Sequence, residues 1–240
     1  MKHRVQRTSF LLVAWLYLFI DIFGASLSTD STGRKIEPQC ERMSNAKSLV
    51  RRFGIVEQVQ QSGAKEKFDI FRLSMDDDGT FPNNKEYPLL LYKSAFLGTQ
   101  SKATQMITGS GQWTSPWVWG IFPFHHYHSN AWELLLCTRG EAIIQMGGPT
   151  GPMVQVATGD LMLVPPGLAH KQILDSGGFT LLGSYPKDSE LRLGPVDTLR
   201  EAPTVQQREN IASCPLPPKD PFFGWTMDDV GLRKSIDSLE

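Results

Sequence analysis

The chain has 240 residues, a length that fits one domain with extensions at its ends. Its 24 basic and 25 acidic residues leave a net charge of -1, which excludes an electrostatic case for binding nucleic acid or other polyanions. Twenty-one glycines and 16 prolines are typical of a turn-rich β protein. Three cysteines (Cys40, Cys137 and Cys214) do not make a disulfide framework, although Cys40 and Cys214 could pair in an oxidising lumen.

Residues 1–28 combine a basic start with an apolar run from Phe10 to Ile20, eleven residues long. This run is too short for a comfortable membrane span, which needs about 20 apolar residues. Ser26 and Ser28 then offer a small-x-small cleavage pattern. The segment therefore predicts a secretory signal peptide and a place in the secretory pathway, secreted or endomembrane. An uncleaved signal anchor is the first alternative, and a buried core helix is the second.

Residues 29–66 form a polar segment before the main domain. Within Ser48–Gln61 the apolar residues Leu49, Phe53, Val56 and Val59 recur at helical spacing, and Gly63 is a plausible stop. The pattern predicts a short helix there.

Residues 67–190 are dominated by short apolar segments separated by glycine and proline turns every eight to twelve residues, as in a β-barrel or jelly roll. We expect an all-β domain, and since no internal repeat is visible, a single one. Ser101–Gly111 is ambiguous, with a short helix followed by a loop as one interpretation. The expected strands are Phe68–Leu73, Tyr87–Tyr92, Val118–His128, Trp132–Thr138, Glu141–Met146, Val154–Val156, Leu161–Val164, His170–Leu174 and Phe179–Tyr185.

Residues 191–240 are a proline-rich, polar tail. Its apolar part is Phe222-Phe223-Gly224-Trp225. Such a cluster is more often a packing anchor than a ligand site, so we expect it to pack on the barrel or on a second subunit.

Two histidines in the third expected strand have the spacing of metal ligands. His126 and His128 are two residues apart, so in a strand both imidazoles lie on one face, about 7 Å apart along the chain. The short polar segment Ser129–Ala131 can turn the chain, and Glu133 then presents a carboxylate from the neighbouring strand.

A third imidazole comes from farther along the chain. His170 follows the turn residues Pro165-Pro166-Gly167. With His126, His128 and Glu133 it makes a borderline-hard ligand set, suited to one divalent ion: Fe or Mn first, with Zn, Ni or Co as alternatives. Four protein ligands leave two positions of an octahedral ion for water, dioxygen or substrate, so these residues would be catalytic through the metal.

Two further residues near this site are expected to have other roles. His125 alternates to the face opposite His126, which favours a structural or supporting role. Cys137 shares the inner face with Glu133, and a packed thiol is the favoured interpretation over a fifth ligand or a reactive thiol.

The full spacing pattern resembles that of the cupin superfamily. The first motif runs from Gly120 through His126, His128 and Glu133 to Gly140, and the second from Gly159 through Pro165 and Gly167 to His170. Similarity to the YjlB-like group of small cupins runs from about Asp76 to Gly224. It rests on Asp76–Asn84, Tyr87–Tyr92, His125–Ser129, Gly147–Gly151, Gly183–Pro186 and Pro215–Pro221. The resemblance implies a single cupin barrel, and as a family expectation a homodimer.

The sequence departs from the family pattern at two positions. Leu174 stands where the general second motif has Asn, and Trp132 stands where many members of the group are expected to have His before the metal glutamate. Neither change removes a ligand, but both make the surroundings of the ion more apolar. A family substrate therefore cannot simply be transferred.

Four aromatic residues crowd the expected metal strands: Trp119, Phe122, Phe124 and Trp132. They could fill the barrel core, or they could line an aromatic mouth suited to an aromatic or polyketide-like substrate. No Lys or Arg is obviously placed to clamp a carboxylate or phosphate, which counts against oxalate and sugar phosphates.

These features favour a metal-dependent oxidoreductase acting on a small organic molecule. The resemblance implies oxidation or aromatisation of a polyketide intermediate in secondary metabolism. A metal-dependent isomerase or lyase and a non-catalytic storage or sensor cupin are the alternatives. The expected partner is a small-molecule substrate, with no nucleic acid and no membrane beyond the N-terminal segment.

Overall fold

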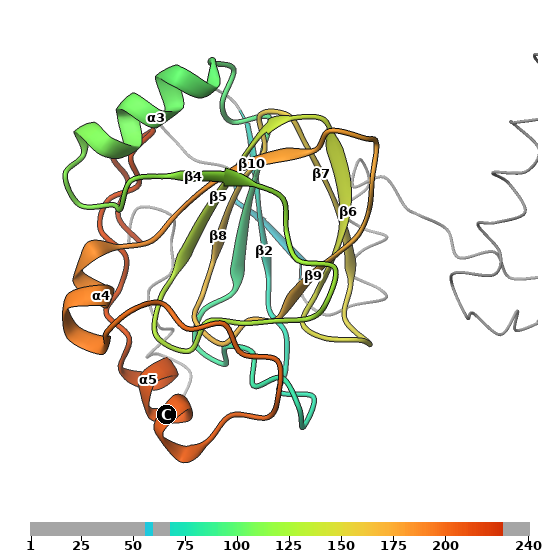
Figure 1. The fold of residues 1–240 in the computed structure, drawn as a ribbon. Coiled ribbons are helices and arrows are strands. Elements are labelled where there is room, and N and C mark those ends of the chain that lie inside the picture. Colours follow the sequence, from blue (N-terminus) through green and yellow to red (C-terminus); the bar gives the residue numbers. More distant parts are fainter. Residues whose placement is uncertain (1–55, 60–67, 228–240) are drawn as a thin grey trace, which may run out of the picture. The chain divides into compact units, whose positions relative to one another are not determined.

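The computed structural model describes residues 56–59 and 68–227. In this part of the chain two antiparallel sheets face each other as an all-β jelly roll (Figure 1). The strands are β1 (Val56–Val59), β2 (Asp69–Leu73), β3 (Leu89–Lys93), β4 (Trp117–Trp119), β5 (Glu133–Arg139), β6 (Glu141–Met146), β7 (Met153–Ala157), β8 (Leu161–Val164), β9 (His170–Asp175) and β10 (Thr180–Ser184). The helices are α3 (Gln100–Gly109), α4 (Lys187–Leu193) and α5 (Val205–Ser213).

The larger sheet has the order β1-β2-β3-β8-β5-β10-β4, and the smaller one the order β7-β6-β9. Strand β5 lies inside the larger sheet between β8 and β10, and Glu133 pairs with Val164. In the smaller sheet His170 pairs with Met146. The first residue of β5 and the first residue of β9 thus come from opposite sheets, and both turn out to face the same site.

Alternation along β5 separates two apolar cores. Leu135 and Cys137 point between the sheets into the inner core, whereas Leu134 and Leu136 point to the outer face of the larger sheet. Each fully buried aliphatic side chain stabilises the fold by about 1.5–3 kcal/mol. Because Glu133 has the parity of Leu135, its carboxylate also lies inside the barrel.

The outer core is covered by parts of the chain outside the sheets. Helix α3 contributes Ala103 and Ile107, both fully buried there. The apolar cluster of the tail packs on the same face, with Phe223 at 4.8 Å between ring centroids from Phe68 and 4.7 Å from Trp225. Asp220 fixes this turn because its carboxylate accepts three backbone N–H groups, those of Phe222, Phe223 and Trp225.

Most expected strands are present. Strands β6 and β8 have the predicted bounds. The ends of the other predicted strands differ from the observed ends by one or two residues, with one exception. The predicted strand Val118–His128 is not continuous. It is a strand only up to Trp119, and His126 and Tyr127 make isolated bridges to His170 and Leu199. Gly120 and Pro123 explain the break, since glycine weakens a strand and proline cannot donate to the ladder.

Two expectations outside the barrel need correction. Val56–Val59, predicted as part of a helix, is a strand that pairs antiparallel with β2. Valine is β-branched and favours strands, and pairing with an available edge overrides the helical spacing. The rest of Ser48–Gln61 lies outside the described residues. Helix α4 crosses the predicted boundary at residue 191, and the tail, predicted only as polar and proline-rich, also contains helix α5, which begins with a capping box between Thr204 and Gln207.

The expected signal segment, residues 1–28, also lies outside the described residues. Within the described ranges no helix is long and apolar enough to cross a membrane. Cys137 and Cys214 form no disulfide with each other, and since Cys40 lies outside the described residues, its pairing with Cys214 stays a prediction.

Candidate metal centre

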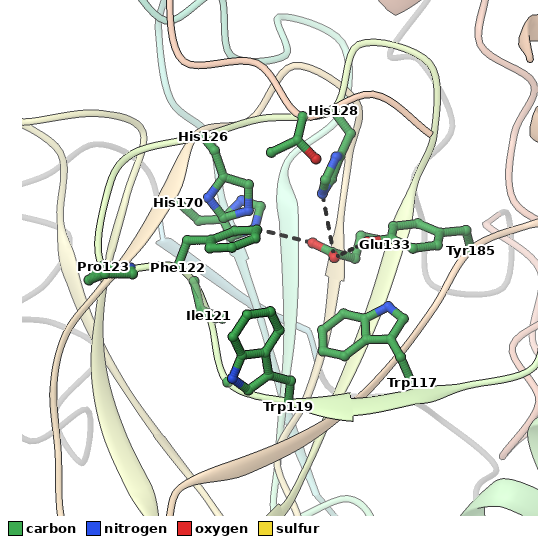
Figure 2. Close-up of a pocket in the computed structure, with 12 residues that line it drawn as sticks. Trp117, Trp119, Ile121, Phe122, Pro123, His126, His128, Glu133, His170 and Tyr185 are labelled. Carbon is green, nitrogen blue, oxygen red and sulfur yellow. Dashed lines mark hydrogen bonds and ion pairs between the residues drawn. The ribbon is translucent and has the colours of Figure 1, made fainter. Parts of the chain in front are cut away.

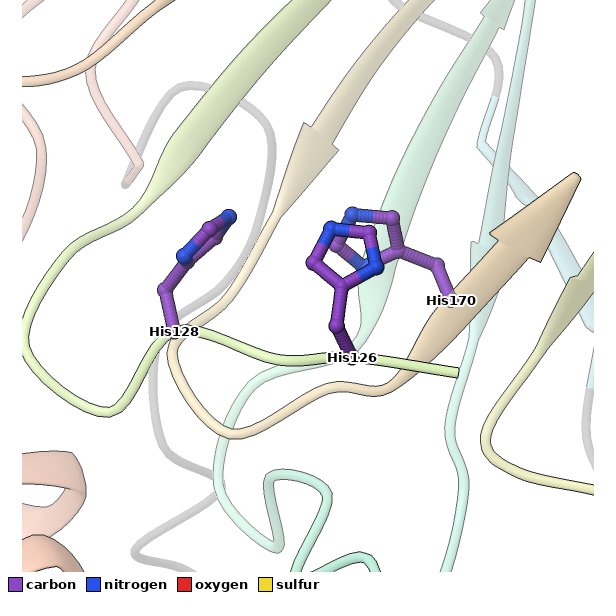
Figure 3. A group of neighbouring side chains, drawn as sticks. All are labelled: His126, His128 and His170. Carbon is purple, nitrogen blue, oxygen red and sulfur yellow. The ribbon is translucent and has the colours of Figure 1, made fainter. Parts of the chain in front are cut away.

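Three imidazoles meet inside the barrel. His126 and His128 lie in the irregular segment after β4, and His170 begins β9. Their ligand nitrogens all lie within 4.8 Å of one another (Figure 3). His126 and His170 exchange both backbone hydrogen bonds, at 3.2 and 2.9 Å, which fixes the distance between two of the rings. All three side chains are buried, so one ion could contact all of them.

Each imidazole is oriented through its Nδ1 atom. The three Nδ1 atoms face backbone carbonyls: that of Phe124 for His126 at 3.3 Å, that of Asp197 for His128, and that of Leu168 for His170 at 3.2 Å. A carbonyl only accepts, so Nδ1 must carry the proton and donate. In the neutral form of each ring the Nε2 atom then has a free lone pair, and this is the form that binds a metal.

Glu133 brings a carboxylate to the same point (Figure 2). Its Oε2 lies 3.1 Å from His170 Nε2, its Oε1 lies 3.5 Å from His128 Nε2, and Tyr185 Oη donates to Oε1 at 2.9 Å. Burial raises the pKa of Glu133, but the neighbouring His128 and His170 outweigh this effect and hold it well below its ordinary value. The group is therefore a carboxylate anion facing imidazole nitrogens.

The protonation of the imidazoles follows from the same environment. Burial, with His170 beside it, lowers the pKa of His126 to about 3, so this ring is neutral. Burial also lowers the pKa of His128, but the charge of Glu133 outweighs it and the net shift is upward. The buried carboxylate thus favours a positive charge at its side, either a proton or a metal cation.

Two buried atoms test whether a cation fits. His128 Nε2 and Glu133 Oε2 are both inaccessible to solvent and have no hydrogen-bond partner among the described residues. An unsatisfied buried polar group costs about 1–3 kcal/mol. Both atoms belong to the predicted ligand set, and a divalent cation would satisfy both. The structure groups the three predicted histidines and places Glu133 beside two of them, His128 and His170; three nitrogens with one oxygen would suit Fe, Mn, Co, Ni or Zn.

A cavity of about 360 Å³ opens next to these residues (Figure 2). Aromatic rings form much of its wall, and within the described part of the chain no Lys or Arg lines it. The lining residues are Trp117, Trp119, Gly120, Ile121, Phe122, Pro123, His126, His128, Glu133, His170, Tyr185 and Thr198. A substrate in this cavity would contact both its apolar wall and the candidate metal ligands.

Two of the four aromatic residues predicted to line a pocket do so, namely Trp119 and Phe122. Phe124 does not. Its ring stacks on Phe122 with centroids 4.8 Å apart, and the guanidinium of Arg200 lies 4.1 Å from its centroid. Phe124 therefore supports the wall from behind.

Trp132 is the other aromatic residue predicted to line the pocket, and this prediction is wrong. The ring is fully buried in the outer core, with its centroid 5.3 Å from that of Tyr87. Trp132 directly precedes Glu133, and neighbouring residues of an extended chain point to opposite faces. A carboxylate inside the barrel thus requires the tryptophan outside it.

Six lining residues were missed: Gly120, Ile121 and Pro123, which lie next to the predicted Trp119 and Phe122, and Trp117, Tyr185 and Thr198. Trp117 lies two residues before Trp119, so in a strand both side chains lie on the same face, and this spacing could have predicted Trp117 as a lining residue. No spacing rule connects Tyr185 or Thr198 with the site. Tyr185 directly follows β10 and depends on the pairing of β10 with β5, whereas the position of Thr198 depends on the path of the chain after β10.

His125 is not among the lining residues, and its ring packs 5.4 Å from Phe81. Cys137 lies in the inner core and is not among the grouped metal-type side chains, and burial raises the pKa of its thiol to about 11, as in a packed thiol.

Gly183 is what lets Trp117 reach the cavity. The two residues are paired across β10 and β4, and a Cβ on Gly183 would lie 1.9 Å from the Trp117 ring. We expect Gly183→Ala to displace this ring and to lower the free energy of unfolding by about 1–3 kcal/mol. Urea denaturation measures the loss. Gly109→Ala is the control, because a Cβ there meets nothing within 4 Å, and equal stability of the two variants would contradict the prediction.

Comparisons with known proteins agree with this architecture. The AraC-like ligand binding domain family matches residues 119–217. The protein YjlB of Bacillus subtilis (strain 168) is 38% identical over 150 residues, which cover 62% of this chain and 87% of YjlB. A two-sheet barrel with three histidines gathered inside it defines a cupin-type protein. The chain belongs to the YjlB group of the cupins.

The solved structures that resemble this chain do so with low TM-scores and low sequence identity. A DUF861 family protein from Thermotoga maritima is 18% identical, with 36% of this chain and 90% of that chain covered and a TM-score of 0.24. The 11S allergen of Cocos nucifera is 16% identical, with 59% and 38% covered and a TM-score of 0.28. A mutant of Bacillus subtilis oxalate decarboxylase is 13% identical, with 59% and 30% covered and a TM-score of 0.25. Likenesses at this level carry no functional conclusion.

Proposed function

We propose that this protein is a metal-dependent oxidoreductase that acts on a small, neutral organic molecule. The observation that carries the proposal is the arrangement of His126, His128, His170 and Glu133 at an open, apolar cavity. A bound Fe or Mn ion would supply Lewis acidity and redox capacity at a substrate oxygen. The apolar cavity wall distinguishes this site from a purely structural metal site, which is normally closed.

The wall residues suggest the class of substrate. Trp117, Trp119 and Phe122 offer ring faces and edges to a flat molecule. Without a lining Lys or Arg among the described residues, a phosphate or free carboxylate would have no counter-charge besides the metal itself. A volume of about 360 Å³ lies at the lower end for small-molecule sites. These features favour a phenolic or enolisable ring compound, such as an aromatic polyketide intermediate in a tailoring step.

A metal-dependent isomerase or lyase is the second candidate, and Tyr185 is the observation that favours it. Burial and the charge of Glu133 raise the pKa of Tyr185, so its hydroxyl stays protonated in the cavity wall. A neutral hydroxyl next to the site can donate a hydrogen bond to an oxyanion that develops on the substrate, and this stabilisation needs no oxidant.

Metal content and oxygen uptake test the proposal. The purified protein is expected to hold about one Fe or Mn per chain by mass spectrometry, as one four-ligand site predicts. Oxygen uptake is expected with phenolic or polyketide-like aldehydes. Metal without uptake would favour the isomerase or lyase. Protein without metal, even after Fe²⁺ or Mn²⁺ is supplied during expression, would contradict a metal-dependent function.

We further propose that the protein enters the secretory pathway and forms a homodimer. The first rests on the basic start and apolar run of residues 1–28, and the second on the family resemblance. The mass of the mature protein tests the first, since cleavage near Ser28 shortens the chain. Its molar mass in solution tests the second.

A further inference from the structure

A segment of the tail, residues 195–201, runs beside the part of the chain that carries His128. We call it the strap. Tyr127 and Leu199 exchange both backbone hydrogen bonds, at 3.0 and 2.9 Å, and the Tyr127 hydroxyl donates to the Glu201 carbonyl at 2.9 Å. On the other side of His128, the amide of Asn130 donates to the Pro195 carbonyl at 2.8 Å. The strap therefore binds the chain on both sides of His128.

Asp197 is the centre of the strap and directs its polar groups at three consecutive residues. Its carboxylate accepts the Ser129 N–H at 2.7 Å and the Ser129 hydroxyl at 2.5 Å. Its own N–H donates to Asn130 Oδ1 at 3.1 Å, and its carbonyl accepts from His128 Nδ1. Ser129 and Asn130 are buried, so water does not compete for these bonds. The next residue, Thr198, lines the cavity.

We propose that Asp197 is a positioning residue for the metal, and that metal binding and the order of the strap are coupled. The carboxylate holds Asp197 in place through Ser129, and this holds the carbonyl that fixes the tautomer and direction of the His128 ring. Partners of this kind, behind a ligand histidine, typically change metal affinity by about 10- to 100-fold. The coupling is reciprocal, so a metal bound at His128 stabilises the strap. The inference rests on the proposed metal site.

Cobalt titration separates positioning from a merely structural role. Asp197→Ala is expected to weaken Co²⁺ binding by about 10- to 100-fold. Asp197→Asn should keep most of the affinity, because an amide oxygen can still accept the Ser129 N–H. Asp188→Ala is the matched control: it removes an exposed aspartate of α4 that pairs only with Arg192 in the described structure. Urea denaturation of each variant shows whether it is folded. Should Asp197→Ala not fold, Ser129→Ala removes one of the two bonds to the carboxylate.

Amide exchange of the wild-type protein tests the coupling without any variant. The N–H groups of Asp197 and Leu199 are bonded to Asn130 and Tyr127, so their exchange by NMR reports on the strap. We expect slower exchange with Co²⁺ than with a chelator. Tight Co²⁺ binding with equal affinity in folded Asp197→Ala and with unchanged exchange would overturn this inference alone. Absence of Co²⁺ binding in the wild type would overturn the metal site and the inference with it.

Discussion

Replacing Glu133 with glutamine is expected to lower metal affinity by more than about 100-fold, a larger loss than removal of a supporting partner causes. The substitution keeps the shape of the side chain and an oxygen that can accept from the Tyr185 hydroxyl. It removes the buried charge that faces His128 and His170 at 3.5 and 3.1 Å. Metal content of the purified variant and its Co²⁺ titration measure the effect.

Glu141→Gln is the control for this experiment. Glu141 is an exposed residue of β6 whose carboxylate accepts from Gln155, and the same change of charge there leaves the site untouched. If Glu133→Gln kept the metal of the wild type, the three histidines alone would hold the ion. The carboxylate would then belong to the surroundings of the metal and not to its ligands.

The second large expected effect is on the free energy of unfolding, and it is seen by comparing substitutions of two tryptophans. Trp132→Ala is expected to lower the free energy of unfolding by about 3–5 kcal/mol, because it leaves a cavity in the outer core. Trp119→Ala is expected to change it by less than about 0.5 kcal/mol, since the Trp119 side chain is 68% exposed. Urea denaturation of both variants gives the two values.

The same two variants distinguish a role in stability from a role in substrate binding. Trp119 lines the cavity and Trp132 does not, so loss of substrate affinity with unchanged stability is expected for Trp119→Ala only. Equal destabilisation by the two substitutions would contradict the assignment of Trp132 to the outer core.

The grouping of the three histidines with Glu133 could be predicted because two motifs of characteristic spacing carry these residues. Spacing puts His126 and His128 together, and turn residues bring Glu133 and His170 back to them. Alternation in β5 also places Leu135 and Cys137 inside the barrel, as expected. The same rule puts Trp132 outside, but the prediction grouped aromatic residues by closeness in sequence and not by parity.

Other features depend on contacts between distant parts of the chain. Asp197 is 69 positions from His128, and no spacing rule connects them. Tyr185 reaches Glu133 only because β10 lies beside β5. The strand Val56–Val59 exists where β2 offers an edge, which a helical stripe in the sequence does not reveal. Propensity and periodicity describe a segment alone, whereas these features are decided by its neighbours.

Two of the four residues that would hold a metal, Glu133 and His170, belong to other pieces of the fold than the residues of β4 and its loop that would select a substrate. Glu133 and His170 begin strands β5 and β9, which are paired within their sheets. Residues 117–123 form a three-residue edge strand, β4, and an irregular loop after it. Mutations in this stretch can accumulate without disturbing the ladders behind the ligands. Descendants of one ancestor could therefore diverge in what they accept while inheriting one reaction centre, and laboratory evolution of new specificities would begin at residues 117–123.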